Sequence, residues 1–213
     1  MEEKTINEKE SLELIAQMIK QTKTRLGKGA GNEYLVWGYS CIVASVVVMV
    51  LAVAFHTPHA AWGYFLIPVL GLTGTAVLRY RNRKADKGEA TTYIEKSLKT
   101  LYECAGVAFL GYLAVCLLHL ECSNIWKGMF FLGMFIPAFC GTVAGTLLQI
   151  KKIKNYSEFA LVVSCCFLVD VLISGEVKIQ AIILGIICWT CSLVVPGRII
   201  NREAKKQSDD ERA

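Results

Sequence analysis

Long apolar stretches, separated by short polar segments, fill most of the chain between residues 35 and 200. Residues 35–55 give 21 positions without a charge, and residues 128–150 give 23 more. A helix of about 20 apolar residues crosses a hydrocarbon layer of about 30 Å, so both stretches are typical of membrane spans. Four further stretches complete the pattern, at about 60–78, 101–120, 157–174 and 179–198.

The shorter stretches, taken singly, also fit buried helices of a soluble protein. Their close spacing favours spans, because almost every residue from 35 to 200 belongs to a stretch or to a short polar connection. The sequence therefore predicts an all-α integral membrane protein in which six transmembrane helices form three helical hairpins. Residues 35–200 make up this transmembrane domain, and residues 201–213 form a tail.

The first 34 residues precede the membrane domain and carry six acidic and six basic side chains. Leu12, Ile15, Ile19 and Leu26 recur at near-helical spacing, which predicts an amphipathic helix over about residues 8–26. Such a helix has three candidate docking places: the membrane interface, the cytoplasmic loops, or a groove on a partner protein. Thr92 and Glu95 share the spacing of a capping box, so the third span's helix is predicted to begin before the membrane.

Lysine and arginine are divided very unevenly between the two ends of the predicted spans. The N-terminal segment, the second and fourth connections and the C-terminal tail lie on one side of the predicted spans, and together they hold 21 of these residues. The opposite side holds only Lys127 and Lys178. Cytoplasmic loops retain basic residues, so both termini are predicted to be cytoplasmic. The net charge of +5 is therefore a topology signal, and nucleic acid is not an expected partner.

Composition agrees with a membrane protein, since 54% of residues are hydrophobic and the mean hydropathy is +0.45. The nine cysteines fall mostly inside the predicted spans, where a thiol behaves as a small apolar group rather than as part of a disulfide framework. Cys188 and Cys191 have the spacing of a redox or zinc pair, but their mid-span position favours a structural role.

The even-numbered spans share a pattern of Trp, Pro, small residues and a basic end. The prolines are Pro68, Pro137 and Pro196, and each follows a tryptophan on the outer side of its span. Two interpretations remain open: three parallel hairpin repeats, or the ordinary use of these residues in membrane helices. Gly141 and Gly145 have the small-xxx-small spacing that lets helices approach closely, within one molecule or between two.

Asp170 is the only acidic residue well inside a predicted span. A charge in the membrane is costly, and intramembrane carboxylates are therefore often functional. Asp170 lies only four residues before the end of its span, so a structural role at the interface, or pairing with Lys178, is the favoured interpretation.

All three histidines lie at the predicted outer ends of the spans. His56 and His59 fall in the first outer loop, and His119 and Glu121 follow the third span. Imidazole and carboxylate groups are zinc ligands, so these four residues form a candidate metal site. The competing interpretation is that they are ordinary interfacial residues in contact with water and lipid headgroups.

The chain shows no phosphate-binding loop, nucleophile elbow or zinc-protease motif, and no row of buried carboxylates. We therefore expect a non-enzymatic accessory, sensing or scaffold protein that meets a partner through its basic cytoplasmic face. The alternative is a small ion or solute transporter or channel, built around the proline-containing helices. The sequence assigns no activity, transported solute, partner or oligomeric state. A homo-oligomer is one arrangement that it allows.

Residues 10–19, ESLELIAQMI, and residues 35–39, LVWGY, carry a resemblance to known proteins. The pattern resembles a group of small bacterial inner-membrane proteins that pair such an N-terminal helix with an aromatic-Gly start to the first span. The resemblance covers mainly the first 40 residues and the general topology. It implies a location in the bacterial plasma membrane and assigns no activity and no functional residue.

Overall fold

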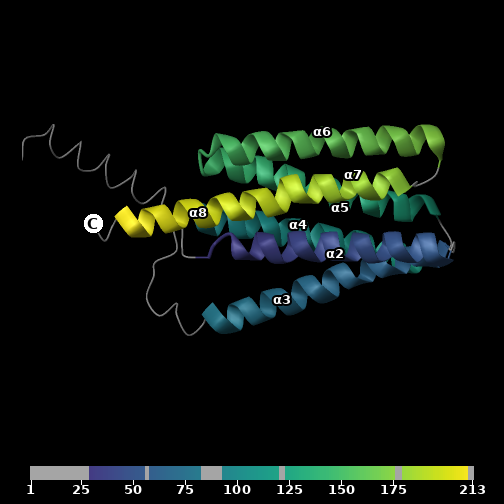
Figure 1. Ribbon diagram of the computed structural model, residues 1–213, viewed down its shortest axis with the longest axis horizontal. Coiled ribbons are helices and arrows are strands. Elements are labelled where there is room, and N and C mark those ends of the chain that lie inside the picture. The colour runs from purple at the N-terminus through teal and green to yellow at the C-terminus, as the bar shows by residue number, and fades with distance from the viewer. Residues whose placement is uncertain (1–28, 56–57, 83–92, 120–122, 176–178, 211–213) are drawn as a thin grey trace, which may run out of the picture.

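The computed structural model describes residues 29–55, 58–82, 93–119, 123–175 and 179–210, and every regular element in these ranges is helical (Figure 1). The predicted amphipathic helix over residues 8–26 lies outside the described residues. The elements, in chain order, are α2 (Asn32–Phe55), the 3-10 helix η1 (Pro58–Phe65), α3 (Leu66–Asn82), α4 (Tyr93–Leu118), α5 (Ser123–Leu147), α6 (Lys151–Ser174), α7 (Ile179–Trp189), the π-helical turn η2 (Thr190–Val194) and α8 (Val195–Asp210).

Six helical segments of the described chain are long and apolar enough to cross a membrane, which confirms the predicted helical class and the number of apolar helices. The final segment, Ile179–Lys206, joins α7, η2 and α8 into one rod. As expected, α4 begins at Tyr93, two turns before the predicted apolar stretch. The last helix continues beyond residue 200 and carries the tail residues as far as Asp210.

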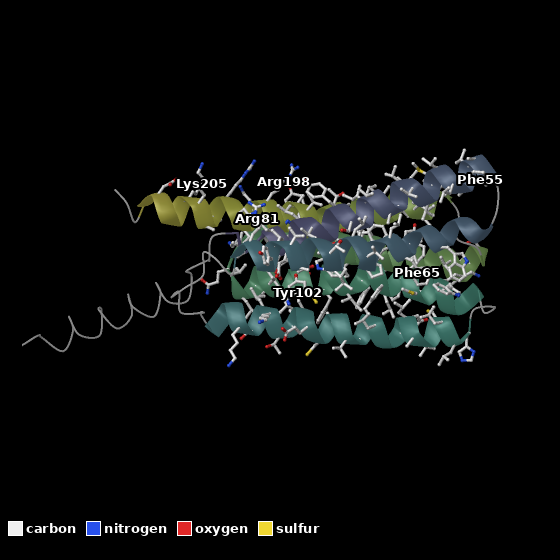
Figure 2. All side chains as sticks on the ribbon, turned by 90° about the horizontal axis from the view of Figure 1, so that it is seen from below. Phe55, Phe65, Arg81, Tyr102, Arg198 and Lys205 are labelled. Atoms are coloured by element: carbon white, nitrogen blue, oxygen red, sulfur yellow. The ribbon has the colours of Figure 1, made fainter. Side chains whose placement is uncertain are left out.

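The helices lie side by side with alternating direction, so their basic ends come together (Figures 1 and 2). Figure 2 shows Arg81, Arg198 and Lys205 toward one end of the bundle and Phe55 and Phe65 toward the other. The three-dimensional structure thus gathers the described basic residues of α3, α4, α6 and α8 at one end, which we call the basic end. Lys127 is the one described basic residue at the opposite end.

Small side chains occupy many buried positions of the bundle, and large apolar side chains cover its outside. The small buried residues include Ala44, Ser45, Ala144, Ala160 and Ser192, beside a few large ones. The outside carries Val107, Leu118, Leu172 and Ile173, each more than 70% exposed. Small residues let helices approach closely, and an apolar outer face is unusual for a water-soluble bundle, whose exposed helix faces are mainly polar.

The contact between α5 and α6 depends on the predicted glycine pair. A Cβ atom on Gly141 would lie 2.4 Å from Ser157 Oγ, and one on Gly145 would lie 2.5 Å from the backbone nitrogen of Lys154. Neither position has room for a side chain, so the glycines allow the two backbones to approach closely. The small-xxx-small pair therefore serves packing within one molecule.

A tight connection joins α5 to α6. Gln149 has a left-handed φ of 58°, the N–H of Ile150 donates to the Gly145 carbonyl at 3.0 Å, and that of Gln149 donates to the Thr146 carbonyl at 3.2 Å. These two bonds form the Schellman motif, which ends a helix and reverses the chain. The motif usually has glycine at the left-handed position, where this chain has glutamine.

The rod of α7, η2 and α8 crosses α2 near the middle and at the basic end. Gly38 of α2 faces Leu193 and Val194, and a Cβ atom there would lie within 3.0 Å of both side chains. At the basic end, Asn201 Nδ2 donates to Asn32 Oδ1 at 2.8 Å, and the N–H of Gly31 donates to Asn201 Oδ1 at 3.1 Å. The start of α2 is thus fixed to α8 by side-chain hydrogen bonds.

The three prolines of the possible repeat have different helical surroundings. Pro68 lies in the first turn of α3, where no intrahelical donor is required. Pro137 lies inside α5, and Pro196 lies at the start of α8, directly after the π-helical turn. Proline removes one backbone donor from a helix, so Pro137 and Pro196 each leave a carbonyl that needs another partner.

Candidate functional site

The centre of the bundle, where α5, α6 and the last rod meet, is the best-defined candidate site. An aromatic cluster fills the half that lies away from the basic end. The ring centroids of Phe130 and Trp189 are 5.6 Å apart, those of Tyr64 and Phe130 5.3 Å, and those of Phe130 and Phe167 5.0 Å. These separations are typical of packed aromatic pairs. The cluster closes the interior at this level.

Trp189 is held in this cluster by a hydrogen bond that Pro137 makes available. The indole Nε1–H donates to the Gly133 carbonyl at 2.9 Å. Gly133 lies four residues before Pro137, so its carbonyl lacks the usual helical donor. The side chain of Trp189 therefore replaces a missing backbone bond of α5.

Cys188, the neighbouring residue, has a similar structural role. Its thiol lies 3.4 Å from the Ala160 carbonyl and 3.6 Å from the Met134 carbonyl, and it is fully buried. A thiol has one hydrogen to donate, so the two carbonyls on α6 and α5 share it. Cys188 and Cys191 are not disulfide-bonded, and the same holds for each of the other described cysteines. The buried position gives no solvent access for redox chemistry.

Two buried serines, Ser157 and Ser192, contact Gly141, the first through its hydroxyl and the second through its backbone carbonyl. Ser157 and Ser192 are fully buried, and neither hydroxyl has a hydrogen-bond partner among the described residues. The Ser192 carbonyl lies 3.3 Å from the position that a Cβ atom on Gly141 would take, and Pro196 supplies no helical N–H to it. These polar oxygens beside a π-helical turn are a candidate binding feature of the interior, since buried hydroxyls normally have partners.

The predicted metal residues are only partly described. His119 lies on the exposed turn after α4, His56 and Glu121 lie outside the described residues, and the side chain of His59 is not described. No group of three or more possible metal ligands occurs among the residues that the structure describes. The zinc site remains a prediction, and metal analysis of protein purified without a histidine tag, with a His119→Ala variant, would test it.

Asp170 is half-buried on α6, just over one turn before Ser174, the last residue of that helix. Its predicted partner Lys178 lies outside the described residues, so the pairing stays a prediction. Close to this helix end, Lys127 Nζ donates to the Gly175 carbonyl, which ties the start of α5 to the end of α6.

Sequence reasoning identified the glycine pair but missed the two buried serines and the bond between Trp189 and Gly133. The sequence did carry a signal for the bond between Trp189 and Gly133. Pro137 leaves the carbonyl of Gly133 without its helical donor, and Trp189 lies in the middle of a predicted span. Comparison of the chain with family models, with curated proteins and with solved structures finds no match.

Proposed function

We propose that this chain is an integral membrane protein of the bacterial plasma membrane, with six spans and both termini in the cytoplasm. Two observations support insertion: the large apolar side chains lie on the outside, and the described basic residues gather at one end. A basic end is retained on the cytoplasmic side of a membrane. The bacterial location rests on the resemblance of residues 10–19 and 35–39. We extend the proposal to an arrangement of the six spans as three helical hairpins.

Within that membrane we propose a non-enzymatic accessory or scaffold function, in which the basic end contacts an acidic partner. The observation that supports it best is the contrast between a closed interior and a charged end. The bundle centre is packed by Met134, Phe167 and Trp189, each at most 2% exposed, whereas Arg198, Arg202 and Lys205 are exposed on α8. Electrostatic complementarity makes such a surface suited to an acidic protein face.

Purification from native membranes tests this function. We expect a protein to co-purify in stoichiometric amount, and its recovery to fall sharply in an Arg202→Glu, Lys205→Glu variant. The control is Gln180→Glu, which adds a negative charge at an exposed position of the opposite end. Recovery that does not depend on the basic end, or a homo-oligomer that carries solute across liposomes, would contradict the proposal.

A transporter or channel is the second candidate, and the interior of the last rod is the observation that favours it. Helices interrupted at mid-span are common at solute sites of transporters, and here a π-helical turn and Pro196 lie beside the hydroxyls of Ser157 and Ser192. If this candidate is correct, a Ser157→Ala, Ser192→Ala variant should keep its thermal stability and lose solute flux in liposomes. Unchanged flux in that variant would exclude these two hydroxyls from the solute path.

A further inference from the structure

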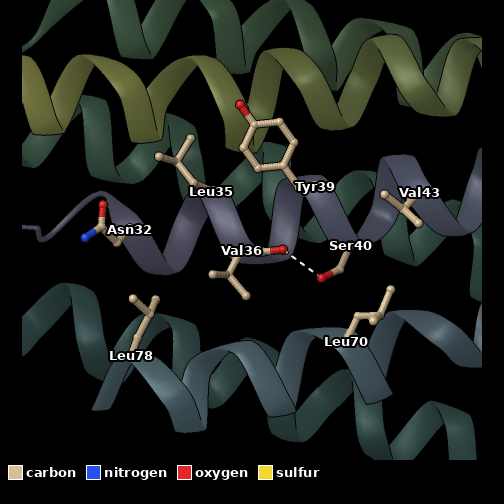
Figure 3. A pocket seen from close by; sticks show the side chains of 8 residues that line it. All are labelled: Asn32, Leu35, Val36, Tyr39, Ser40, Val43, Leu70 and Leu78. Atoms are coloured by element: carbon tan, nitrogen blue, oxygen red, sulfur yellow. Dashed lines mark hydrogen bonds between the residues drawn. The ribbon is translucent and has the colours of Figure 1, made fainter. Parts of the chain in front are cut away.

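An apolar groove runs along α2 on the outside of the bundle (Figure 3). It has a volume of about 420 Å³ and opens sideways, away from the bundle centre. Helix α2 forms its floor, and Leu70 and Leu78 of α3 form one wall. The lining residues are Asn32, Leu35, Val36, Tyr39, Ser40, Val43, Leu70 and Leu78.

The shape of the groove follows from α3. Leu70, Gly74 and Leu78 are four residues apart and lie on one face of that helix. Gly74 packs directly on Val36 of α2, because a Cβ atom on Gly74 would lie 2.6 Å from Val36 Cγ1. The glycine therefore brings α3 close to α2, and Leu70 and Leu78 on either side of it form the wall of the groove. The Ser40 hydroxyl donates to the Val36 carbonyl at 2.7 Å, so it is satisfied within α2. Most of the remaining lining is hydrocarbon.

The side of the groove that faces α8 is polar and positively charged near Tyr39, which lies between Leu35 and Val43 along α2 (Figure 3). Arg198 of α8 donates from Nη2 to the Tyr39 hydroxyl at 2.8 Å, which places its guanidinium beside the lining. This bond uses one of the five N–H donors of an arginine. Arg202 and Lys205 follow Arg198 at helical spacing, and both are exposed.

Two further features concern the charge around the groove. Asn32 begins α2 and lines the groove, so the positive end of the helix dipole lies at the basic end of the groove, seven residues before Tyr39. Arg79 Nε of α3 lies 3.5 Å from Glu33 Oε1, and both side chains are more than half exposed. Glu33 offsets the charge of Arg79, whereas Arg198 is bonded to the neutral hydroxyl of Tyr39.

We propose that the groove binds one anionic phospholipid, with an acyl chain along α2 and the phosphate at Arg198. The proposal rests on the membrane insertion proposed above. Charge complementarity identifies the occupant: a hydrocarbon groove on the outside of the bundle that is bordered by Arg198 on its α8 side fits an acyl chain joined to a negative headgroup. Arginine suits a phosphate, because its planar fork can donate two hydrogen bonds to it.

Native mass spectrometry of the purified full chain in detergent provides the test. We expect phosphatidylglycerol to bind at least fivefold more tightly than phosphatidylethanolamine, and Arg198→Gln to remove most of that preference. Lys152→Gln is the matched control, since it removes a charge from the basic end on α6. Glycerol phosphate, which has the headgroup charge and no acyl chain, should not bind detectably.

A second pair of variants tests the acyl part of the site. Val43 lines the groove and is 48% exposed, so the larger side chain of Val43→Trp should fill the groove. Val46→Trp adds a tryptophan to α2 at an exposed position outside the lining. We expect the first variant to lose phosphatidylglycerol binding and the second to keep it. Both positions are exposed, so both variants should fold, which an unchanged melting temperature would verify.

The outcomes separate this proposal from membrane insertion. Protein that stays in the membrane after carbonate extraction, yet binds both lipids equally in wild type and Arg198→Gln, overturns the lipid site alone. A dimer in the mass spectrum that Val43→Trp disrupts would identify a second copy as the occupant and overturn the lipid. Protein released by carbonate would overturn insertion, and the lipid site with it.

Discussion

Trp189 illustrates how one proline can determine the partner of a residue on another helix. Pro137 leaves the Gly133 carbonyl without a helical donor, and the indole N–H of Trp189 fills that place at 2.9 Å. The bond lies between α5 and the last rod, within the aromatic cluster. A backbone defect in one helix thus becomes a specific contact between two helices.

A double-mutant cycle should reveal this coupling. Trp189→Phe is expected to lower the free energy of unfolding by about 1 kcal/mol through the lost hydrogen bond, besides any loss of packing. Pro137→Ala gives α5 its own donor to the Gly133 carbonyl, so in that background Trp189→Phe should cost less. The measurement is SDS-induced unfolding in detergent, and equal costs in both backgrounds would contradict the proposed role of Pro137.

Among the residues that the structure describes, Gln149 is the one residue other than glycine with a left-handed φ, at 58°. Because this conformation costs a side-chain-bearing residue about 1 kcal/mol, Gln149→Gly should raise the free energy of unfolding by roughly that amount. Gln149→Val should lower it, since a β-branched residue tolerates the conformation least. The same measurement on Gln180→Gly, inside the first turn of α7, should show no gain.

At the scale of helices, glycines lie where two helix backbones approach most closely. The connection of three residues between α5 and α6 makes them neighbours, and Gly141 and Gly145 let their backbones meet. Helix α4 lacks such a contact at its own glycines: nothing lies within 4 Å of a Cβ atom placed on Gly106 or Gly111. Its outward face carries exposed apolar side chains such as Val107.

Alanine substitutions at Gly145 and Gly111 should therefore distinguish the effect of helix packing on stability from the effect of helix propensity. Gly145→Ala brings a methyl group against the Lys154 backbone and should lower the free energy of unfolding by about 1–3 kcal/mol. Gly111→Ala meets open space and should leave it unchanged or raise it by up to about 1 kcal/mol. SDS titration of both variants checks the difference. Equal destabilisation would show that α4 has a contact at Gly111 that the monomer lacks.

At the scale of the whole molecule, the helices alternate in direction and the described basic residues collect at one end (Figure 2). This arrangement predicts a topology that reporter fusions can read. A reporter joined after Ser123 or Gly175 should be active outside the cytoplasm. A reporter joined after Lys87 or Lys154 should be active inside it, and a cytoplasmic signal at Ser123 would contradict the six-span topology.

The sequence by itself determined the features that depend on neighbouring residues. The lengths of the apolar stretches predicted the helices, because crossing hydrocarbon requires about 20 residues whatever the rest of the chain does. The 21 basic residues on one side predicted their common end, since alternating helices return to the same end at every second connection. The spacing of Gly141 and Gly145 predicted a close helix contact without naming the partner.

The tertiary structure decided which helices meet and what those meetings produce. It showed α6 to be the partner of the glycine pair, Gly133 to be the acceptor for Trp189, and Ser157 and Ser192 to lie together beside Gly141. It also placed Arg198 beside Tyr39, on the α8 side of a groove formed by α2 and α3. These pairings join residues that are far apart in the chain, and hydropathy and spacing carry no information on which faces will pack together.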